Sequence, residues 1–73
     1  MPSTAVGKID YDDETQQLFV TFVTSGRRYV YFDVPWDAYD AFRHAFSKGT
    51  WFNTHIRDRY QHALVFDPRA KAG

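Results

Sequence analysis

The sequence predicts an α+β fold in which a three-stranded antiparallel β-meander is followed by two short helices packed on one face. Apolar residues alternate at a spacing of two in much of the stretch 5–34, as in half-buried strands. After residue 35 they recur at spacings of three and four, as on one side of a helix. The 73 residues make one domain. We place this domain at residues 5–66, followed by a flexible C-terminal tail at 67–73.

The first two strands are expected at residues 5–11 and 18–23. The acidic run between them, residues 12–16, has the polar composition of a solvated turn. A calcium loop of the EF-hand type would need alternating Asp or Asn, a central Gly and a distant Glu, and none of these follows in the sequence. We therefore expect a turn and no metal site here.

The third strand is expected at residues 28–34, the segment richest in β-branched and aromatic residues. Ser25 and Gly26 predict a two-residue turn before it, because Gly tolerates positive φ. The register that follows places Val20 opposite Tyr31. One face of the hairpin then holds an apolar layer for the helices to cover. The members of this layer are Leu18, Val20, Phe22, Tyr29 and Tyr31.

The opposite face of the sheet is apolar as well. Phe19, Val30 and Phe32 lie there because side chains alternate along a strand. Two short helices cover only one side of a sheet, so this face needs another cover. The C-terminal segment, a second copy of the chain or a ligand could supply it. We therefore regard these three residues as a candidate interface for a protein partner or for self-association.

Pro35 suits the first turn of a helix, and the apolar spacing after it predicts a helix over residues 35–46. Phe42 and Phe46 belong to its apolar stripe. Trp36 lies at the flank of that stripe, where we expect it to cover the edge of the core.

Gly49 is expected to end this helix as a left-handed cap, and Thr50 to cap a second helix over residues 51–60. Apolar residues repeat every four positions in that helix and are expected to face the core: Phe52, Ile56 and Tyr60. The short apolar run 62–66 is expected to form a closing strand or an extended pad on the sheet.

Sixteen residues between positions 18 and 60 carry a resemblance through their order and spacing. They are Leu18, Val20, Phe22, Gly26, Tyr29, Tyr31, Val34, Pro35, Tyr39, Ser47, Gly49, Phe52, Asn53, Ile56, Arg57 and Tyr60. The pattern resembles the KTSC domain, named for the C-terminal end of some lysyl-tRNA synthetases and also found as small stand-alone bacterial proteins. The hallmark of that family is a central Tyr-x-Tyr, here Tyr29 and Tyr31. The resemblance implies no established activity, but it suggests RNA binding through the synthetase connection.

Charge is balanced over the whole chain but not along it. Nine basic and nine acidic residues give a net charge of zero, which argues against strong non-specific binding of polyanions by counterion release. Residues 1–42 carry 3 basic and 7 acidic residues, net −4, whereas residues 43–73 carry 6 and 2, net +4. Together with the resemblance, this asymmetry favours a non-enzymatic binding module for RNA or single-stranded nucleic acid.

The candidate nucleic-acid-binding residues lie in or near the second helix: Lys48, Trp51, His55, Arg57 and Arg59. Cations would contact phosphates and Trp51 would stack on bases. Alternatively, Arg57 and Arg59 form ion pairs with Asp33, Asp58 or Asp67, and the aromatic side chains belong to the core.

No catalytic, metal or cofactor site is expected. His55 and His62 are seven residues apart, too far for the i, i+4 pair of a zinc helix, and no cysteine completes a zinc set. Ser47 and Thr50 are better explained as helix caps than as nucleophiles. A small hydrolase, the remaining alternative, would need a pocket at His55. No apolar run reaches the length of a membrane span and the N-terminus has no signal-peptide pattern, so we expect a cytoplasmic protein without a membrane partner.

Overall fold

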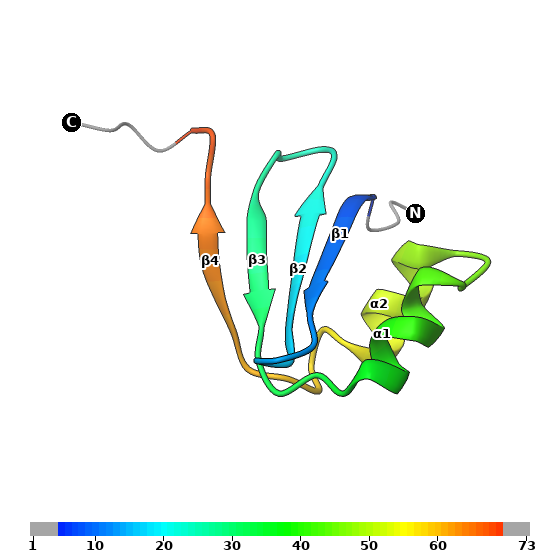
Figure 1. The fold of residues 1–73 in the computed structure, drawn as a ribbon. Helices are drawn as coiled ribbons and strands as arrows, with labels where there is room; N and C mark the ends of the chain where they lie inside the picture. The colour runs from blue at the N-terminus through cyan, green and yellow to red at the C-terminus, as the bar shows by residue number, and fades with distance from the viewer. Residues whose placement is uncertain (1–4, 70–73) are drawn as a thin grey trace.

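The computed structural model describes residues 5–69 as a four-stranded antiparallel sheet with two helices (Figure 1). The strands are β1 (Val6–Asp12), β2 (Gln17–Phe22), β3 (Arg28–Tyr31) and β4 (His62–Phe66), and the helices are α1 (Trp36–Arg43) and α2 (Lys48–His55). The strands lie side by side in the order in which they occur in the chain. The α+β class is confirmed, and the number of strands is corrected from three to four.

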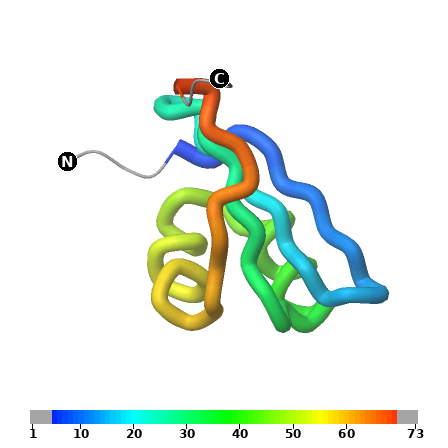
Figure 2. The backbone as a smooth tube through the Cα atoms, turned by 90° about the vertical axis from the view of Figure 1, so that its left-hand side faces the viewer, coloured from blue at the N-terminus to red at the C-terminus, as the bar shows by residue number. Residues whose placement is uncertain are grey.

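The fourth strand, β4, was left out of the predicted three-stranded meander, but a closing strand was one of the two alternatives given for residues 62–66. After α2 the chain returns to the sheet and β4 pairs antiparallel with β3, at one edge (Figure 2). Tyr29 pairs with Leu64, and Tyr31 pairs with His62. Every residue of β4 is exposed, so its apolar residues show no alternation, and the sequence could not separate a strand from an extended pad.

The register between β2 and β3 differs by two residues from the prediction. Val20 pairs with Tyr29 rather than with Tyr31. The Phe22 N–H donates to the Arg27 carbonyl at 2.9 Å, so the loop that follows is longer than the predicted two-residue turn. A shift of two leaves every side chain on its predicted face, because side chains alternate with a period of two. The face assignment is therefore confirmed although the register was wrong.

The core lies between the sheet and both helices. It consists of Leu18, Val20, Tyr31, Val34, Phe42, Phe52 and Ile56. Tyr31 is only 4% exposed, and its ring lies edge-on to that of Phe52 at a centroid distance of 5.4 Å. Tyr29 packs half-buried at the margin of this core. Both tyrosines therefore face the helices, as predicted. Buried aromatic area of this kind stabilises a chain that has no cysteine for a disulfide.

Helix α1 ends at Arg43, three residues before its predicted end. The Ala45 N–H donates to the Phe42 carbonyl at 3.1 Å, a tight final turn that breaks the helical period. Phe46 therefore leaves the apolar stripe to which it was assigned and is fully exposed, at 108%. Trp36, expected to cover the edge of the core, is 47% exposed at the start of the helix.

Helix α2 begins three residues before its predicted start. Ser47, and not Thr50, is the N-cap: the Ser47 Oγ accepts a hydrogen bond from the Thr50 N–H at 3.3 Å. Gly49, predicted to be the C-cap of the preceding helix, lies buried in the first turn of α2. The helix also ends earlier than predicted, so Arg57 and Arg59 lie in the turn that follows it.

Replacing Ser47 with alanine is expected to lower the free energy of unfolding by about 1 kcal/mol, because the Thr50 N–H loses its acceptor. Thr54→Ala is a matched control: its hydroxyl donates to the Thr50 carbonyl from an exposed position in the same helix, and we expect a change within about 0.5 kcal/mol. Urea unfolding followed by circular dichroism measures both. Equal losses in the two variants would contradict the assignment of the cap.

The predicted C-terminal tail is in contact with the β2–β3 loop at its first residues. The Arg27 Nε lies 3.3 Å from the Asp67 Oδ2. Pro68 lies against Gly26, where a Cβ would come within 2.8 Å of the Pro68 Cγ and where φ is +72°. Glycine therefore suits position 26 both for its backbone conformation and for this close approach. Residues 70–73 of the predicted tail lie outside the described residues.

Candidate functional site

Five aromatic rings meet where α2 faces β2, β3 and β4. They belong to Phe22, Tyr29, Tyr31, Phe52 and His62. Consecutive rings lie 5.2–5.9 Å apart between centroids, and the contacts close on themselves: Phe22 to Tyr29, Tyr29 to His62, His62 to Tyr31, Tyr31 to Phe52, and Phe52 to Phe22. We call this arrangement the five-ring cluster. Three strands and one helix contribute to it, so it forms only once the whole domain has folded.

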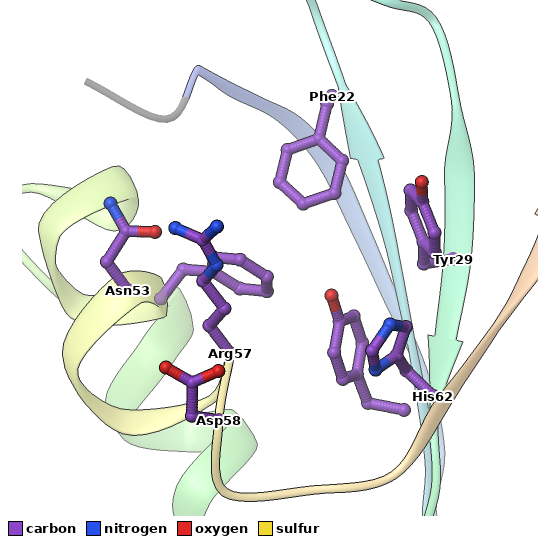
Figure 3. A pocket seen from close by; sticks show the side chains of 8 residues that line it. Phe22, Tyr29, Asn53, Arg57, Asp58 and His62 are labelled. Atoms are coloured by element: carbon purple, nitrogen blue, oxygen red, sulfur yellow. The ribbon is translucent and has the colours of Figure 1, made fainter. Parts of the chain in front are cut away.

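The five-ring cluster lines a half-open cleft of about 440 Å³ (Figure 3). Asn53, Arg57 and Asp58 line it on the helix side. Figure 3 shows the Arg57 side chain extending along this wall to the Asn53 carboxamide, whereas the Asp58 carboxylate lies at the lower end of the wall. The cleft thus combines an aromatic lining with a guanidinium group, a carboxamide and a carboxylate.

The two arginines after α2 take part in no ion pair within residues 5–69. The basic side chains that do pair with carboxylates there are Lys8, Arg27, Arg28, Arg43 and His44. The expected alternative, in which Arg57 and Arg59 pair with Asp33, Asp58 or Asp67, is therefore wrong. Within residues 5–69, neither guanidinium group is held in an ion pair with a carboxylate.

Burial raises the pKa of Tyr31 to about 12, and the nearby Tyr29 adds to this shift. The positive charge of Arg57 acts in the opposite direction and lowers the pKa of Tyr31, whereas the negative charge of Asp58 raises it. The Tyr31 phenol is therefore protonated at neutral pH. It offers a neutral hydroxyl to the cleft that it lines.

Trp51 and His55, two of the predicted nucleic-acid contacts, do not line the cleft. The Trp51 ring stacks on Phe42 of α1 at a centroid distance of 5.5 Å and on His55 at 4.4 Å. Helical residues two positions apart are rotated by about 200° around the helix axis, so Trp51 lies on the side of α2 opposite Asn53. His55 lines neither the cleft nor the depression beside it, so the pocket that a hydrolase at His55 would need is not found at either place.

The three predicted cations are spread out. Arg57 lines the cleft, and Arg59 lies in a shallower depression beside it with Tyr60 and Gln61. Lys48 opens α2, whereas Arg57 follows its end, so the eight-residue helix, roughly 12 Å long, lies between the two. Of the five candidate residues, the structure brings Arg57 and Arg59 together at the depression, and Trp51 and His55 together elsewhere on α2.

Of the eight lining residues, sequence reasoning named only Arg57 as a site candidate. It assigned four aromatic residues to the core, Phe22, Tyr29, Tyr31 and Phe52, and gave no role at a site to Asn53, Asp58 and His62. Asn53 precedes Arg57 by four positions, the spacing that places two helical residues on one side, so this signal was available. His62 joins the cleft only because β4 pairs it with Tyr31. Asp58 lies in an irregular turn, where no periodic pattern exists to place it.

The sheet face away from the helices carries the predicted interface. Val30 is 7% exposed there, and Phe19 and Phe32 are half-buried. The Arg28 guanidinium lies 5.0 Å above the Phe19 ring and 3.4 Å from the Asp10 carboxylate. The chain's own side chains thus cover part of this face, and its role as an interface stays a prediction. The exposed apolar side chains beside Phe19 are Val65 and Phe66.

Both helices have eight residues, and no helix in the described part of the chain is long and apolar enough to cross a membrane. No three His, Cys, Asp or Glu side chains within residues 5–69 gather as a metal-binding group would.

Fold and cleft together define a small α+β domain in which two helices cover one face of a four-stranded antiparallel sheet. The family model of the KTSC domain matches residues 2–60, and the chain belongs to this family. Among solved structures, it is similar to a KTSC domain protein from Yersinia pestis, with 29% sequence identity and a TM-score of 0.81 over 90% of this chain and 92% of that one. No curated protein matches the sequence. The resemblance found in the sequence is confirmed.

Proposed function

We propose that this chain is a small non-enzymatic binding module for RNA or other single-stranded nucleic acid, and that the ligand binds in the cleft beside α2. The observation that carries the proposal is the convergence of the five-ring cluster with the Arg57 guanidinium. Proteins bind single strands by stacking bases on aromatic side chains and by contacting the backbone with cationic ones. Guanidinium groups make strong, charge-assisted hydrogen bonds to phosphate oxygens.

An anionic ligand suits this cleft better than a cationic one. Aromatic clusters also bind quaternary ammonium groups through cation–π attraction. Here, however, the guanidinium of Arg57 runs along the helix wall beside the rings, and the Asp58 carboxylate lies lower on that wall (Figure 3). A cation among the rings would be repelled by the nearby unpaired guanidinium. A nucleotide supplies both an aromatic ring for the cluster and a negative charge for Arg57.

The proposal moves the contact surface from the second helix to the cleft. Lys48, Trp51 and His55 lie away from it and are expected to contribute less than Arg57. Because the chain has no net charge, long-range attraction to a polyanion is weak. Binding is therefore expected to be modest and to be strongest at low salt.

Arg57→Ala is expected to weaken binding of a single-stranded RNA about tenfold, or roughly 1.4 kcal/mol, because the phosphate loses its guanidinium partner. Arg43→Ala is the matched control: it removes the same charge, but Arg43 is paired with Asp40 at 2.9 Å on α1. We expect that variant to bind within about twofold of the unchanged chain. Fluorescence anisotropy with a labelled RNA at low salt measures both.

Three outcomes would count against the proposal. The unchanged chain could show no binding at high micromolar concentration, which would remove the function. Arg57→Ala and Arg43→Ala could weaken binding equally, which would reduce the effect to net charge. Lys48→Ala could weaken binding where Arg57→Ala does not, which would return the contact surface to the second helix.

A further inference from the structure

We propose that the cleft and the depression beside it together hold two consecutive nucleotides, with Arg57 on the phosphate that joins them. This inference rests on the proposed function. It adds the length of the ligand that the site accepts and the position of the phosphate that Arg57 contacts. It follows from how the two hollows share their walls.

The two hollows meet at a common border. The cleft and the shallower depression share Arg57, Asp58 and His62. A guanidinium at such a border is placed to bind a phosphate whose two nucleosides lie on either side of it. The depression continues past this border to Arg59, Tyr60 and Gln61, so a second guanidinium follows for the next phosphate.

The two hollows differ in how deeply they enclose a base. Five rings line the cleft, whereas only Tyr60 and His62 offer rings to the depression. The cleft volume of about 440 Å³ lies in the lower part of the range of small-molecule sites, roughly 300–1,000 Å³. This size suits one nucleotide rather than a stacked run. The first base is therefore enclosed by the cluster, and the second lies in the open depression.

The charges around the two hollows limit the length of the ligand. Arg57 and Arg59 against Asp58 give a local net charge of +1. On the side of Phe22 and Tyr29, the cleft lining includes no Lys or Arg other than Arg57. The arginines nearest to that side in the sequence, Arg27 and Arg28, pair with Asp67 and Asp10. A third nucleotide on that side would find no positive partner.

Oligoadenylates without terminal phosphates test this footprint: adenosine, ApA, ApApA and the octamer, each titrated and followed by amide NMR shifts. ApA is expected to bind at least tenfold more tightly than adenosine, because it adds the phosphate that Arg57 contacts. From ApApA to the octamer, affinity should rise only in proportion to the number of positions along the strand at which the site can bind. The slope of log K against log salt should be about −0.7 for ApA and about −1.4 for longer chains, one and two phosphates respectively.

Substitutions of the two arginines test which of them contacts which phosphate. Arg57→Gln should remove the salt dependence of ApA binding and reduce its advantage over adenosine to the contribution of the second base. Arg59→Gln should reduce the salt slope of ApApA from about −1.4 to about −0.7. Arg43→Gln is the control and should change none of these quantities, because Arg43 lies on α1 in contact with Asp40.

Each failure has its own signature. The affinity for the octamer could rise by more than the number of equivalent binding positions along it, with a slope of log K against log salt steeper than about −2. This result would show that the chain contacts more than two nucleotides. Nucleic-acid binding would then be supported, but the two-nucleotide footprint would be wrong. Equal binding of adenosine and ApA, insensitive to Arg57→Gln, would remove the phosphate contact. If even the octamer does not bind at low salt, the proposed function itself fails.

Discussion

Replacing Phe42 with alanine is expected to lower the free energy of unfolding by about 3–5 kcal/mol. Phe42 is completely buried and its ring packs against those of Trp51 and Phe52, at centroid distances of 5.5 and 6.2 Å. The truncation leaves a cavity between the two helices that neighbouring rings cannot fill without leaving their own contacts. A domain of this size has a total stability of only about 4–11 kcal/mol. A large part of the chain population is then expected to unfold in mild denaturant.

Phe46 supplies the matched control, four residues further along. Its side chain is fully exposed, so Phe46→Ala makes the same chemical change without a cavity, and we expect an effect within about 0.5 kcal/mol. Urea unfolding followed by circular dichroism measures both variants. A loss at Phe46 as large as the loss at Phe42 would mean that the tight turn after α1 is placed wrongly and that Phe46 belongs to the core.

The stability of the chain is expected to fall by about 2 kcal/mol more between pH 9 and pH 12 than that of Tyr31→Phe. Burial raises the pKa of Tyr31 from 10.0 to about 12 in the folded chain. Between these values the folded state retains a proton that the unfolded state has released, so stability decreases as pH rises. The full difference in the free energy of unfolding, roughly 2.7 kcal/mol, is reached only above pH 12, where the phenol has lost its proton in both states. Below pH 10 this contribution is fully present.

Urea unfolding at pH 9 and at pH 12 measures this difference. The two proteins differ only at position 31, where the phenylalanine variant has no proton to lose, so the comparison isolates the contribution of the Tyr31 phenol. Parallel stability curves for the two proteins across this range would show that the phenol is not held in a low-dielectric core. Tyr31 would then have to be more exposed to solvent than the 4% found in the structure.

The faces of the sheet could be predicted because side-chain alternation survives errors in register. The predicted turn at Ser25–Gly26 was too short, yet the two-residue error kept Tyr29 and Tyr31 beneath the helices. The helix boundaries were predicted less accurately than the faces of the sheet. Ser47 and Thr50 are both good capping residues three positions apart, and in the structure the Ser47 hydroxyl donates to that of Thr50 at 3.0 Å. Local preference alone could not choose between them.

The candidate site could be predicted only in part. Arg57 was identified from charge and spacing, but the cleft depends on the meeting of Tyr31 with His62, residues that are far apart in the sequence and adjacent in the sheet. Pairings of this kind leave no periodic signal in either segment. An exposed edge strand such as β4 is especially hard to predict, because neither of its faces is buried and alternation is lost.

Because β4 supplies His62, the cleft is complete only when this strand is paired with β3. The family model ends at residue 60, just before this strand begins at His62. A fragment cut at that boundary would keep both helices and three strands but would lack the imidazole side of the cluster. It would also lose the Arg27–Asp67 contact. Any fusion or truncation made for functional work therefore has to leave the stretch from His62 to Pro68 whole, or it will assay a domain whose cleft lacks the His62 ring.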